Sequence, residues 1–195
     1  MNVIYKEPNW KSYIVETTNP VFTPEQCNII SKIGRSMPPI NAEVGAGRYD
    51  TKQRLSHISW IPFNNVDAKP MYETLNQLMY ITNKRHFGFD DMCINEQAQY
   101  TEYPEGGFYD WHTDSELIMK NEPPVRKISM TLVLSPESDF EGGGLELASS
   151  GKIVRPKQGH AVFFASFIQH RVVPITRGLR KSLVMWFGGE PFKWL

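Results

Sequence analysis

Residues 127–134 read Lys-Ile-Ser-Met-Thr-Leu-Val-Leu, and this stretch decides the class of fold. Ile128, Met130, Leu132 and Leu134 occupy every second position, which is the period of a β-strand. Six further segments of similar character, bounded by glycine or proline, are predicted as strands: residues 97–103, 145–148, 152–155, 160–164, 169–174 and 180–187. Many short strands at this spacing are typical of a sandwich or jelly roll, with or without a functional site.

The first half of the chain has a helical character. Thr23, Pro24 and Gln26 form a helix start, with a capping threonine, proline at the first helical position and glutamine three residues after the cap. This helix should end near Met37, where two prolines follow. A second helix is predicted from residue 67 to about residue 87, because its apolar residues form one helical stripe.

Helices followed by strands predict an α+β protein in which N-terminal helices pack outside a double-stranded β-helix, or jelly-roll, core. We expect one domain over residues 1–195. Helical support and a lid would take up about residues 1–94, and the jelly-roll core about residues 95–189. Residues 54–61 are predicted as a strand within the first part.

The composition excludes several classes of protein. Among 195 residues, 21 are Lys or Arg and 21 are Asp or Glu, so the chain lacks the basic excess of a protein that coats nucleic acid. Two cysteines do not make a disulfide framework. There is no signal-peptide pattern and no apolar run of membrane-spanning length. We expect a soluble cytoplasmic protein with no membrane partner.

His112 and Asp114 form the first candidate metal site. Residues two apart in an extended segment point to the same side, so an imidazole and a carboxylate could meet one ion. The alternative is a histidine that only hydrogen-bonds a nearby carboxylate. His170 follows an apolar run and could supply a third ligand from a late strand. Two histidines and one carboxylate leave three positions open on iron, which suits a non-haem Fe(II) oxygenase.

Arg180 lies ten residues after His170, with a strand, a turn and a strand between them. Residues one hairpin apart can reach the same cavity, and a guanidinium can bind a carboxylate through two parallel hydrogen bonds. A dicarboxylate that chelates iron at one end would need such a partner at the other. The alternative is a solvated basic turn.

Four ordered blocks resemble one known family. They are residues 103–114 (YPEGGFYDWHTD), 140–147 (FEGGGLEL), 156–164 (PKQGHAVFF) and 170–180 (HRVVPITRGLR). They resemble the prolyl 4-hydroxylase superfamily of 2-oxoglutarate/Fe(II) dioxygenases, and most closely its bacterial and phage PKHD-type hydroxylases. The resemblance covers about residues 95–189. Four blocks with compatible spacing are far more specific than a single motif.

The resemblance implies a role for each matching residue. His112, Asp114 and His170 would be the iron ligands. Arg180 would bind the distal carboxylate of 2-oxoglutarate, with Tyr103 hydrogen-bonded to the same group. One aromatic near the iron and five candidate substrate contacts complete the set: Trp186, and Tyr109, Trp111, Arg48, Tyr49 and Trp60. The alternative for the aromatic residues is ordinary packing.

Residues 41–50, together with the strand at 54–61, lie where such enzymes place a lid over the substrate. Gly45 and Gly47 could act as hinges of this loop, which we expect to become ordered when peptide binds. An ordinary connection is the alternative. Three other histidines, His57, His86 and His160, are predicted not to be ligands.

The resemblance implies an enzyme that hydroxylates a prolyl residue of a protein or peptide and releases succinate and CO2. Its cofactors would be Fe(II) and 2-oxoglutarate, with ascorbate as a reductant. One alternative is a hydroxylase of a free amino acid or another small molecule. Another is a non-catalytic jelly-roll module that binds metal or peptide.

Nucleic-acid demethylation is a further alternative, because residues 152–181 contain seven Lys or Arg and no Asp or Glu. Overall neutrality and the ten-residue spacing from His170 to Arg180 favour the prolyl hydroxylase type. The sequence therefore predicts a protein or peptide partner that contains proline, and no nucleic-acid partner.

Overall fold

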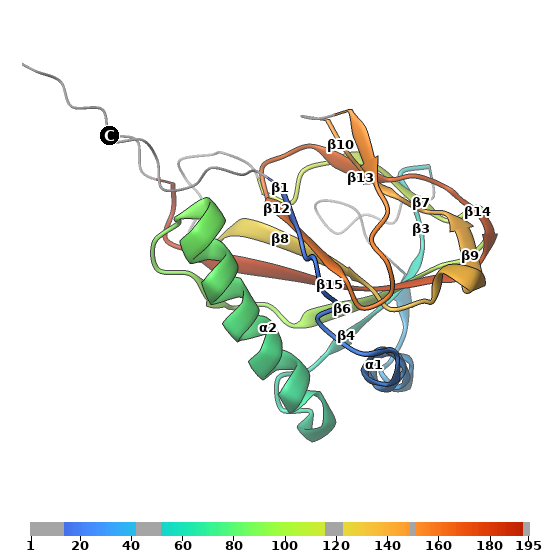
Figure 1. Cartoon of the computed structure of the whole chain (residues 1–195), viewed down its shortest axis with the longest axis horizontal. Helices are drawn as coiled ribbons and strands as arrows, with labels where there is room; N and C mark the ends of the chain where they lie inside the picture. The colour runs from blue at the N-terminus through green and yellow to red at the C-terminus, as the bar shows by residue number, and fades with distance from the viewer. Residues whose placement is uncertain (1–13, 42–51, 116–122, 149–150, 193–195) are drawn as a thin grey trace, which may run out of the picture.

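The structure, a computed structural model, describes residues 14–41, 52–115, 123–148 and 151–192. Its largest element is an eight-stranded antiparallel sheet (Figure 1). In spatial order its strands are β1 (Ile14–Glu16), β12 (Ala161–Ala165), β8 (Val125–Val133), β15 (Arg180–Gly189), β6 (Ala98–Tyr103), β4 (His57–Ile61) and β2 (Ile40–Asn41), and β5 (Cys93–Ile94) pairs with β15. Strands from both sides of residue 94 therefore build this sheet.

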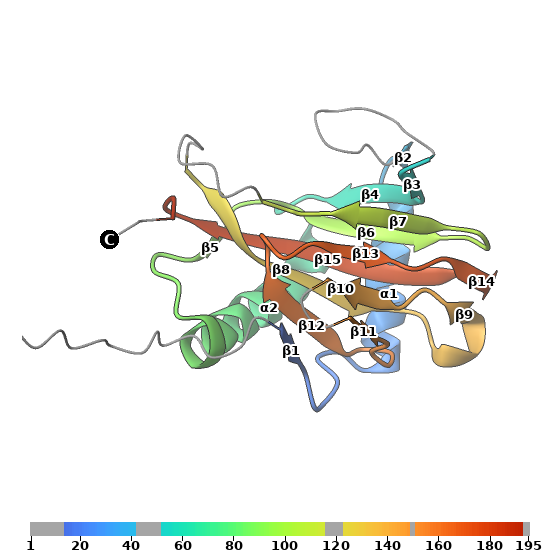
Figure 2. The same ribbon diagram turned by 90° about the horizontal axis from the view of Figure 1, so that it is seen from above.

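A second antiparallel sheet lies across the first, on the side away from the helices (Figures 1 and 2). Its order is β11 (Lys152–Val154), β10 (Leu145–Leu147), β13 (His170–Val172), β7 (Phe108–His112) and β3 (Arg54–Leu55). A small ladder of β14 (Ile175–Gly178) and β9 (Phe140–Gly142) closes one end. The predicted α+β architecture, with two β layers and external helices, is confirmed.

All seven strands predicted from the second half of the chain are present, and each end lies within two residues of its predicted position. One strand predicted in the first half of the chain is not continuous. Residues 54–61 do not form one strand, since Arg54–Leu55 joins the smaller sheet and His57–Ile61 joins the larger one. This segment therefore bridges the two sheets and is part of their framework.

Helix α1 (Pro24–Ser36) begins and ends where the sequence predicts. The Thr23 hydroxyl accepts a hydrogen bond from the Gln26 amide, and the Gln26 side chain accepts one from the Thr23 amide. This reciprocal capping satisfies two backbone donors that the first turn leaves free. The helix packs on the larger sheet, where the Ser59 hydroxyl donates to the Gly34 carbonyl at 2.6 Å.

The second predicted helix consists of three parts: a 3-10 turn η1 (Val66–Ala68), helix α2 (Lys69–Thr82) and a π-helical turn η2 (Asn83–Phe87). The predicted apolar stripe is buried in the main core at Met71, Leu75 and Met79. Tyr72 joins α2 to the sheet, because its hydroxyl donates to the Ile61 carbonyl and accepts from the Ala98 amide. A further 3-10 turn, η3 (Glu137–Asp139), precedes β9.

None of the described helices is both long enough and apolar enough to span a membrane.

Gly34 is the point of closest approach between α1 and the larger sheet. A Cβ atom there would lie 2.2 Å from Cγ of Tyr100 and 2.7 Å from its Cβ, so Gly34→Ala forces the helix away from β6. Overpacking costs about 1–3 kcal/mol, which exceeds the gain of about 1 kcal/mol that alanine brings to a helix interior. We expect Gly34→Ala to lower the free energy of unfolding, measured by urea titration.

Asn28→Ala, at an exposed position of the same helix, is the control. We expect it to change the free energy of unfolding by less than about 0.5 kcal/mol. Equal stability of Gly34→Ala and the wild type would contradict the close packing of α1 on Tyr100.

Candidate active site

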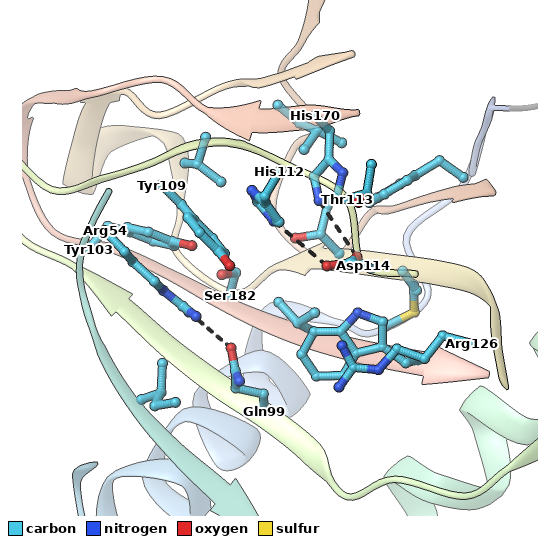
Figure 3. A pocket seen from close by; sticks show the side chains of 18 of the residues that line it. Arg54, Gln99, Tyr103, Tyr109, His112, Thr113, Asp114, Arg126, His170 and Ser182 are labelled. Atoms are coloured by element: carbon cyan, nitrogen blue, oxygen red, sulfur yellow. Dashed lines mark hydrogen bonds and ion pairs between the residues drawn. The ribbon is translucent and has the colours of Figure 1, made fainter. Parts of the chain in front are cut away.

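His112, Asp114 and His170 converge between the two sheets (Figure 3). In the pairing of β7 with β13, His112 and His170 are direct cross-strand partners. The His112 Nε2 atom is 3.6 Å from Asp114 Oδ1, and the His170 Nε2 atom is 3.5 Å from Asp114 Oδ2. One ligand atom from each residue lies within 4.8 Å of the other two. The sheet thus gathers three potential metal ligands at one point.

Backbone carbonyls orient both imidazoles. The His112 Nδ1 atom is 2.7 Å from the Asp110 carbonyl oxygen, and the His170 Nδ1 atom is 2.9 Å from the Ile168 carbonyl oxygen. A carbonyl can only accept, so each Nδ1 carries the proton and each Nε2 keeps its lone pair. Such outer hydrogen bonds fix the tautomer and orientation of metal-binding histidines.

Asp114 is held by two serines. The Ser129 hydroxyl donates to Asp114 Oδ2 at 2.6 Å, and its oxygen lies 2.9 Å from the Ser166 hydroxyl. The Ser166 carbonyl accepts from the amides of Asp114 and Ser115. Burial raises the pKa of the Asp114 carboxyl, but the two histidines, Ser129 and Trp186 lower it by more. The carboxylate is therefore ionised at neutral pH, as a metal ligand must be.

Burial, together with the neighbouring His170, lowers the pKa of His112 to about 4. His112 is consequently neutral at pH 7 and can donate its lone pair to a metal. Two imidazoles and one carboxylate gathered at one point match the donor set of non-haem Fe(II) sites, whose other positions stay open to ligands. The residues present therefore fit an iron ion.

A cavity of about 520 Å³ extends from this group between the sheets. Arg180 lines it at the start of β15 and is only 2% exposed. Its guanidinium donates to the Ser182 hydroxyl at 3.2 Å, and its Cζ atom lies 5.6 Å from the centre of the Tyr103 ring. Within the described part of the chain, no carboxylate forms an ion pair with Arg180. Because an unpaired buried charge is costly, this arrangement favours an anionic ligand.

The aromatic residues named from the sequence surround the same cavity. Tyr109 stacks on the His112 ring, with centroids 3.5 Å apart, while Trp60 lies against Trp186 at 5.9 Å. Among the described residues, the buried Trp186 indole nitrogen has no partner within hydrogen-bond geometry. The Arg171 Cζ atom lies 4.8 Å from the centre of the Trp111 ring. The structure thus brings four predicted aromatic residues to one space.

Arg48 and Tyr49, and all of the loop 41–50 except Asn41, lie outside the described residues. Of the described His, Cys, Asp and Glu residues, only the group at His112 could hold a metal. The His160 Nδ1 atom lies 3.0 Å from the Thr17 carbonyl, which agrees with its predicted structural role. His57 is exposed on β4.

Sequence reasoning missed several residues that line the cavity or support it. Arg54, Gln99 and Arg126 line the cavity wall, and Ser129 holds Asp114. Their positions depend on strand register, because Arg54 and Gln99 are 45 residues apart and still form a hydrogen bond. The one signal available was the alternation of β8, which places Ser129 between apolar neighbours.

Comparison with known proteins agrees with this geometry. The sequence model of the 2OG-Fe(II) oxygenase superfamily matches residues 98–188, which include all three ligand residues and Arg180. The chain is therefore similar to this superfamily over just under half of its length. The matched residues include the His112 group, which is the candidate iron site.

Curated proteins similar to this chain are PKHD-type hydroxylases. The one from Idiomarina loihiensis is 42% identical over 87 residues, which is 43% of this chain and 38% of the relative. The one from Teredinibacter turnerae is 39% identical over 88 residues, which is 43% of this chain and 39% of the relative. The matched region is thus about two fifths of the length of these relatives.

Solved structures share the fold over most of the chain. A Pseudomonas putida prolyl-4-hydroxylase has a TM-score of 0.71 at 22% identity and covers 91% of this chain and 93% of its own. A Trichoplax adhaerens prolyl hydroxylase, in complex with a peptide fragment of hypoxia inducible factor, has a TM-score of 0.73 at 18% identity over 91% of this chain and 84% of its own. The jelly-roll prediction is therefore confirmed.

Removal of one imidazole should abolish tight metal binding. We expect His112→Ala to weaken binding of Mn(II), a stand-in for Fe(II), by at least roughly 100-fold, because one of three protein ligands is lost. Titration calorimetry measures the affinity. His160→Ala, which removes an imidazole outside the cavity, serves as the control and should bind as the wild type does. Unchanged affinity in His112→Ala would exclude this metal site.

Ser129→Ala tests the support of the carboxylate. Loss of the 2.6 Å hydrogen bond frees Asp114 to rotate, and loss of such outer contacts costs roughly 10- to 100-fold in metal affinity. Thr131→Ala, two residues along the same strand, is the matched control and should keep the wild-type affinity. If both variants bind Mn(II) equally, Ser129 has no role in positioning Asp114.

Proposed function

We propose that the chain is an Fe(II)- and 2-oxoglutarate-dependent hydroxylase that acts on a prolyl residue of a protein or peptide. The observation that carries this proposal is a shared cavity. Three potential metal ligands and a buried guanidinium without a carboxylate partner among the described residues line the same 520 Å³ space. A dicarboxylate cosubstrate needs a metal ion for one end and a guanidinium for the carboxylate at its other end.

In this proposal His112, Asp114 and His170 hold the iron. When bound, Fe(II) with 2-oxoglutarate and O2 supplies the oxidative decarboxylation that yields succinate and CO2 and hydroxylates the substrate. The protein's own contribution is orientation and exclusion of water. The fixed imidazole tautomers and the two serines beneath Asp114 keep the three ligands in position before the metal arrives.

Arg180 would bind the distal carboxylate of 2-oxoglutarate. Its fork is anchored by Ser182 and faces Tyr103, which is its direct partner in the pairing of β15 with β6. Burial lowers the pKa of this guanidinium, but the group remains charged at any physiological pH. The Arg180 guanidinium is buried and has little contact with water. A carboxylate that binds there forms charge-assisted hydrogen bonds with it, so its binding is favourable.

The names of the relatives support a prolyl substrate. The curated relatives are called PKHD-type hydroxylases, and the structural relatives are prolyl hydroxylases, one of them in complex with a peptide. Tyr109, Trp111 and Trp60 line the cavity, and their aromatic side chains would contact a pyrrolidine there. We propose the same contact role for Arg48 and Tyr49. Use of ascorbate and a cytoplasmic location remain predictions.

The contacts of the basic segment argue against a nucleic-acid substrate. Arg171 pairs with Glu146 and Arg177 pairs with Glu141, while Lys181 approaches Asp139 at 4.0 Å. Acidic side chains from β9, β10 and η3 thus neutralise positive charges that a phosphate backbone would need. The intact group of three ligands plus Arg180 argues against a non-catalytic module.

The decisive experiment is succinate formation from 2-oxoglutarate by the purified protein with Fe(II), with and without proline-containing peptides. We expect turnover that His112→Ala abolishes and that a peptide stimulates. Arg180→Gln should raise KM for 2-oxoglutarate roughly 10- to 100-fold, because a charge-assisted double hydrogen bond is lost. Arg177→Gln, which removes an exposed arginine, is the control.

Two outcomes would contradict the proposal. Absence of both succinate and 2-oxoglutarate binding would favour the binding-module alternative. Stimulation by a free amino acid and by none of the peptides would move the substrate to the small-molecule class.

A further inference from the structure

We propose that Arg54 binds a carboxylate of the substrate, next to the residue that is hydroxylated. This inference rests on the proposed function and gives the substrate a chemical feature that the fold does not imply. The site consists of Arg54, its two hydrogen-bond partners and the ring of Tyr109, on the wall of the cavity formed by β3, β6 and β7 (Figure 3).

The Arg54 guanidinium is buried and fixed. The residue is 5% exposed, its Nε donates to the Ser56 hydroxyl at 2.8 Å, and its Nη2 donates to Gln99 Oε1 at 3.0 Å. The Thr101 hydroxyl also donates to Gln99 Oε1, at 3.3 Å, which holds the amide. Both acceptors of Arg54 are neutral. A guanidinium has five N–H donors, so this one keeps donors for a ligand.

Other arginines of the described chain show the contrast. Arg35, Arg126, Arg171 and Arg177 each pair with a glutamate at 2.9 Å or less. Arg54 is more buried than any of these, and within the described residues no carboxylate reaches it. Arg180 is the other buried arginine that has no carboxylate partner among the described residues, and under the proposed function it binds the distal carboxylate of 2-oxoglutarate. Arg54 has no such counterion among the described residues.

The net charge of the cavity with Fe(II) and 2-oxoglutarate bound also favours a negatively charged group on the substrate. Fe(II) and 2-oxoglutarate bring charges of equal size and opposite sign, and Asp114 offsets Arg180. Arg126 lies 4.0 Å from the centre of the Trp186 ring, and Glu96 offsets its charge. Among these arginines one positive charge is then left over, at Arg54. An isolated buried cation is costly, so an anion that enters with the substrate binds favourably.

The position of Arg54 places this anion close to the chemistry. Arg54 is the direct partner of Tyr109 in the pairing of β3 with β7, and its Cζ atom lies 4.5 Å from the centre of the Tyr109 ring. The same ring stacks on the imidazole of His112. One aromatic ring thus separates the Arg54 guanidinium from a metal ligand. A carboxylate bound at Arg54 belongs to the residue that is hydroxylated or to its immediate neighbour.

Two sources supply this carboxylate in a prolyl substrate: the C-terminal carboxylate of a terminal proline, or an aspartate beside the proline. Two peptide pairs distinguish the sources. The first compares acetyl-Ala-Ala-Pro with its C-terminal amide. The second compares acetyl-Ala-Asp-Pro-amide with acetyl-Ala-Asn-Pro-amide. Each pair differs only in the charge of one group.

Calorimetry on the full chain with Mn(II) and 2-oxoglutarate measures the affinity for each peptide. We expect one carboxylate peptide to bind roughly 10- to 100-fold more tightly than its neutral partner, since hydrogen bonds to charged groups have this strength. Arg54→Gln should reduce this ratio to about 2 or less, and Arg54→Lys should keep part of it. The exposed Arg177→Gln variant should keep the wild-type ratio.

Equal affinities within both pairs would overturn the inference, as would an absence of measurable binding of all four peptides. A ratio in Arg54→Gln that matches the wild type would overturn it too. Weaker binding of 2-oxoglutarate itself in Arg54→Gln would assign Arg54 to the cosubstrate instead. The peptides are also titrated onto the metal-free protein, so that their binding can be measured even if Mn(II) does not bind. Failure of the protein to bind Mn(II) or 2-oxoglutarate would overturn the proposed function. If both bind, but the carboxylate and neutral peptides bind equally well, only this inference is overturned.

Discussion

The pairing of β7 with β13 is the constraint on which the rest of the site depends. It sets His170 opposite His112, and it brings the Ser166 carbonyl to the amide of Asp114 at 3.0 Å. Three ligands from two distant segments therefore need no flexible loop to meet. The two flanking carbonyls that fix the imidazole tautomers come from the same strands or their immediate extensions. Backbone hydrogen bonding alone thus specifies most of the ligand geometry.

The second organising feature is positive charge held inside the molecule. Arg54 and Arg180 are both buried, and both are anchored by neutral oxygen atoms. Each costs stability in the ligand-free protein, because a desolvated guanidinium lacks a counterion there. The same cost favours ligands that carry carboxylates, since binding relieves it. Stability of the empty protein and affinity for anions are therefore opposed at these two positions.

Local sequence signals predicted much of this arrangement. The capping residues of α1 and the alternation along β8 report on neighbours within a few positions, so the corresponding elements were found. His112 and Asp114 are two residues apart, and Arg180 lies one hairpin beyond His170, which made a common cavity predictable. Superfamily resemblance supplied the identity of the iron and of its cosubstrate.

The remaining features depend on register between distant strands. Residues 54–61 cross from one sheet to the other at Ser56, and no local pattern marks this crossing. Gln99 and Arg54 meet only because β4 and β3 lie beside β6 and β7. The pairing of Arg171 with Glu146 and of Arg177 with Glu141 across strand ladders is likewise a product of register. Charge counts along the chain could not distinguish these neutralised arginines from Arg54 and Arg180, which have no ion pair among the described residues.

The two faces of strand β6 contact different parts of the structure. Tyr100 and Glu102 contact α1 through Gly34 and Arg35, whereas Gln99 and Tyr103 line the cavity. Successive side chains leave a strand on opposite sides, so six residues serve both the helix and the ligand. Substitutions on the inner face can therefore change which molecules bind without disturbing the helix contact. Such a strand gives this scaffold room to acquire new selectivity while its architecture stays intact.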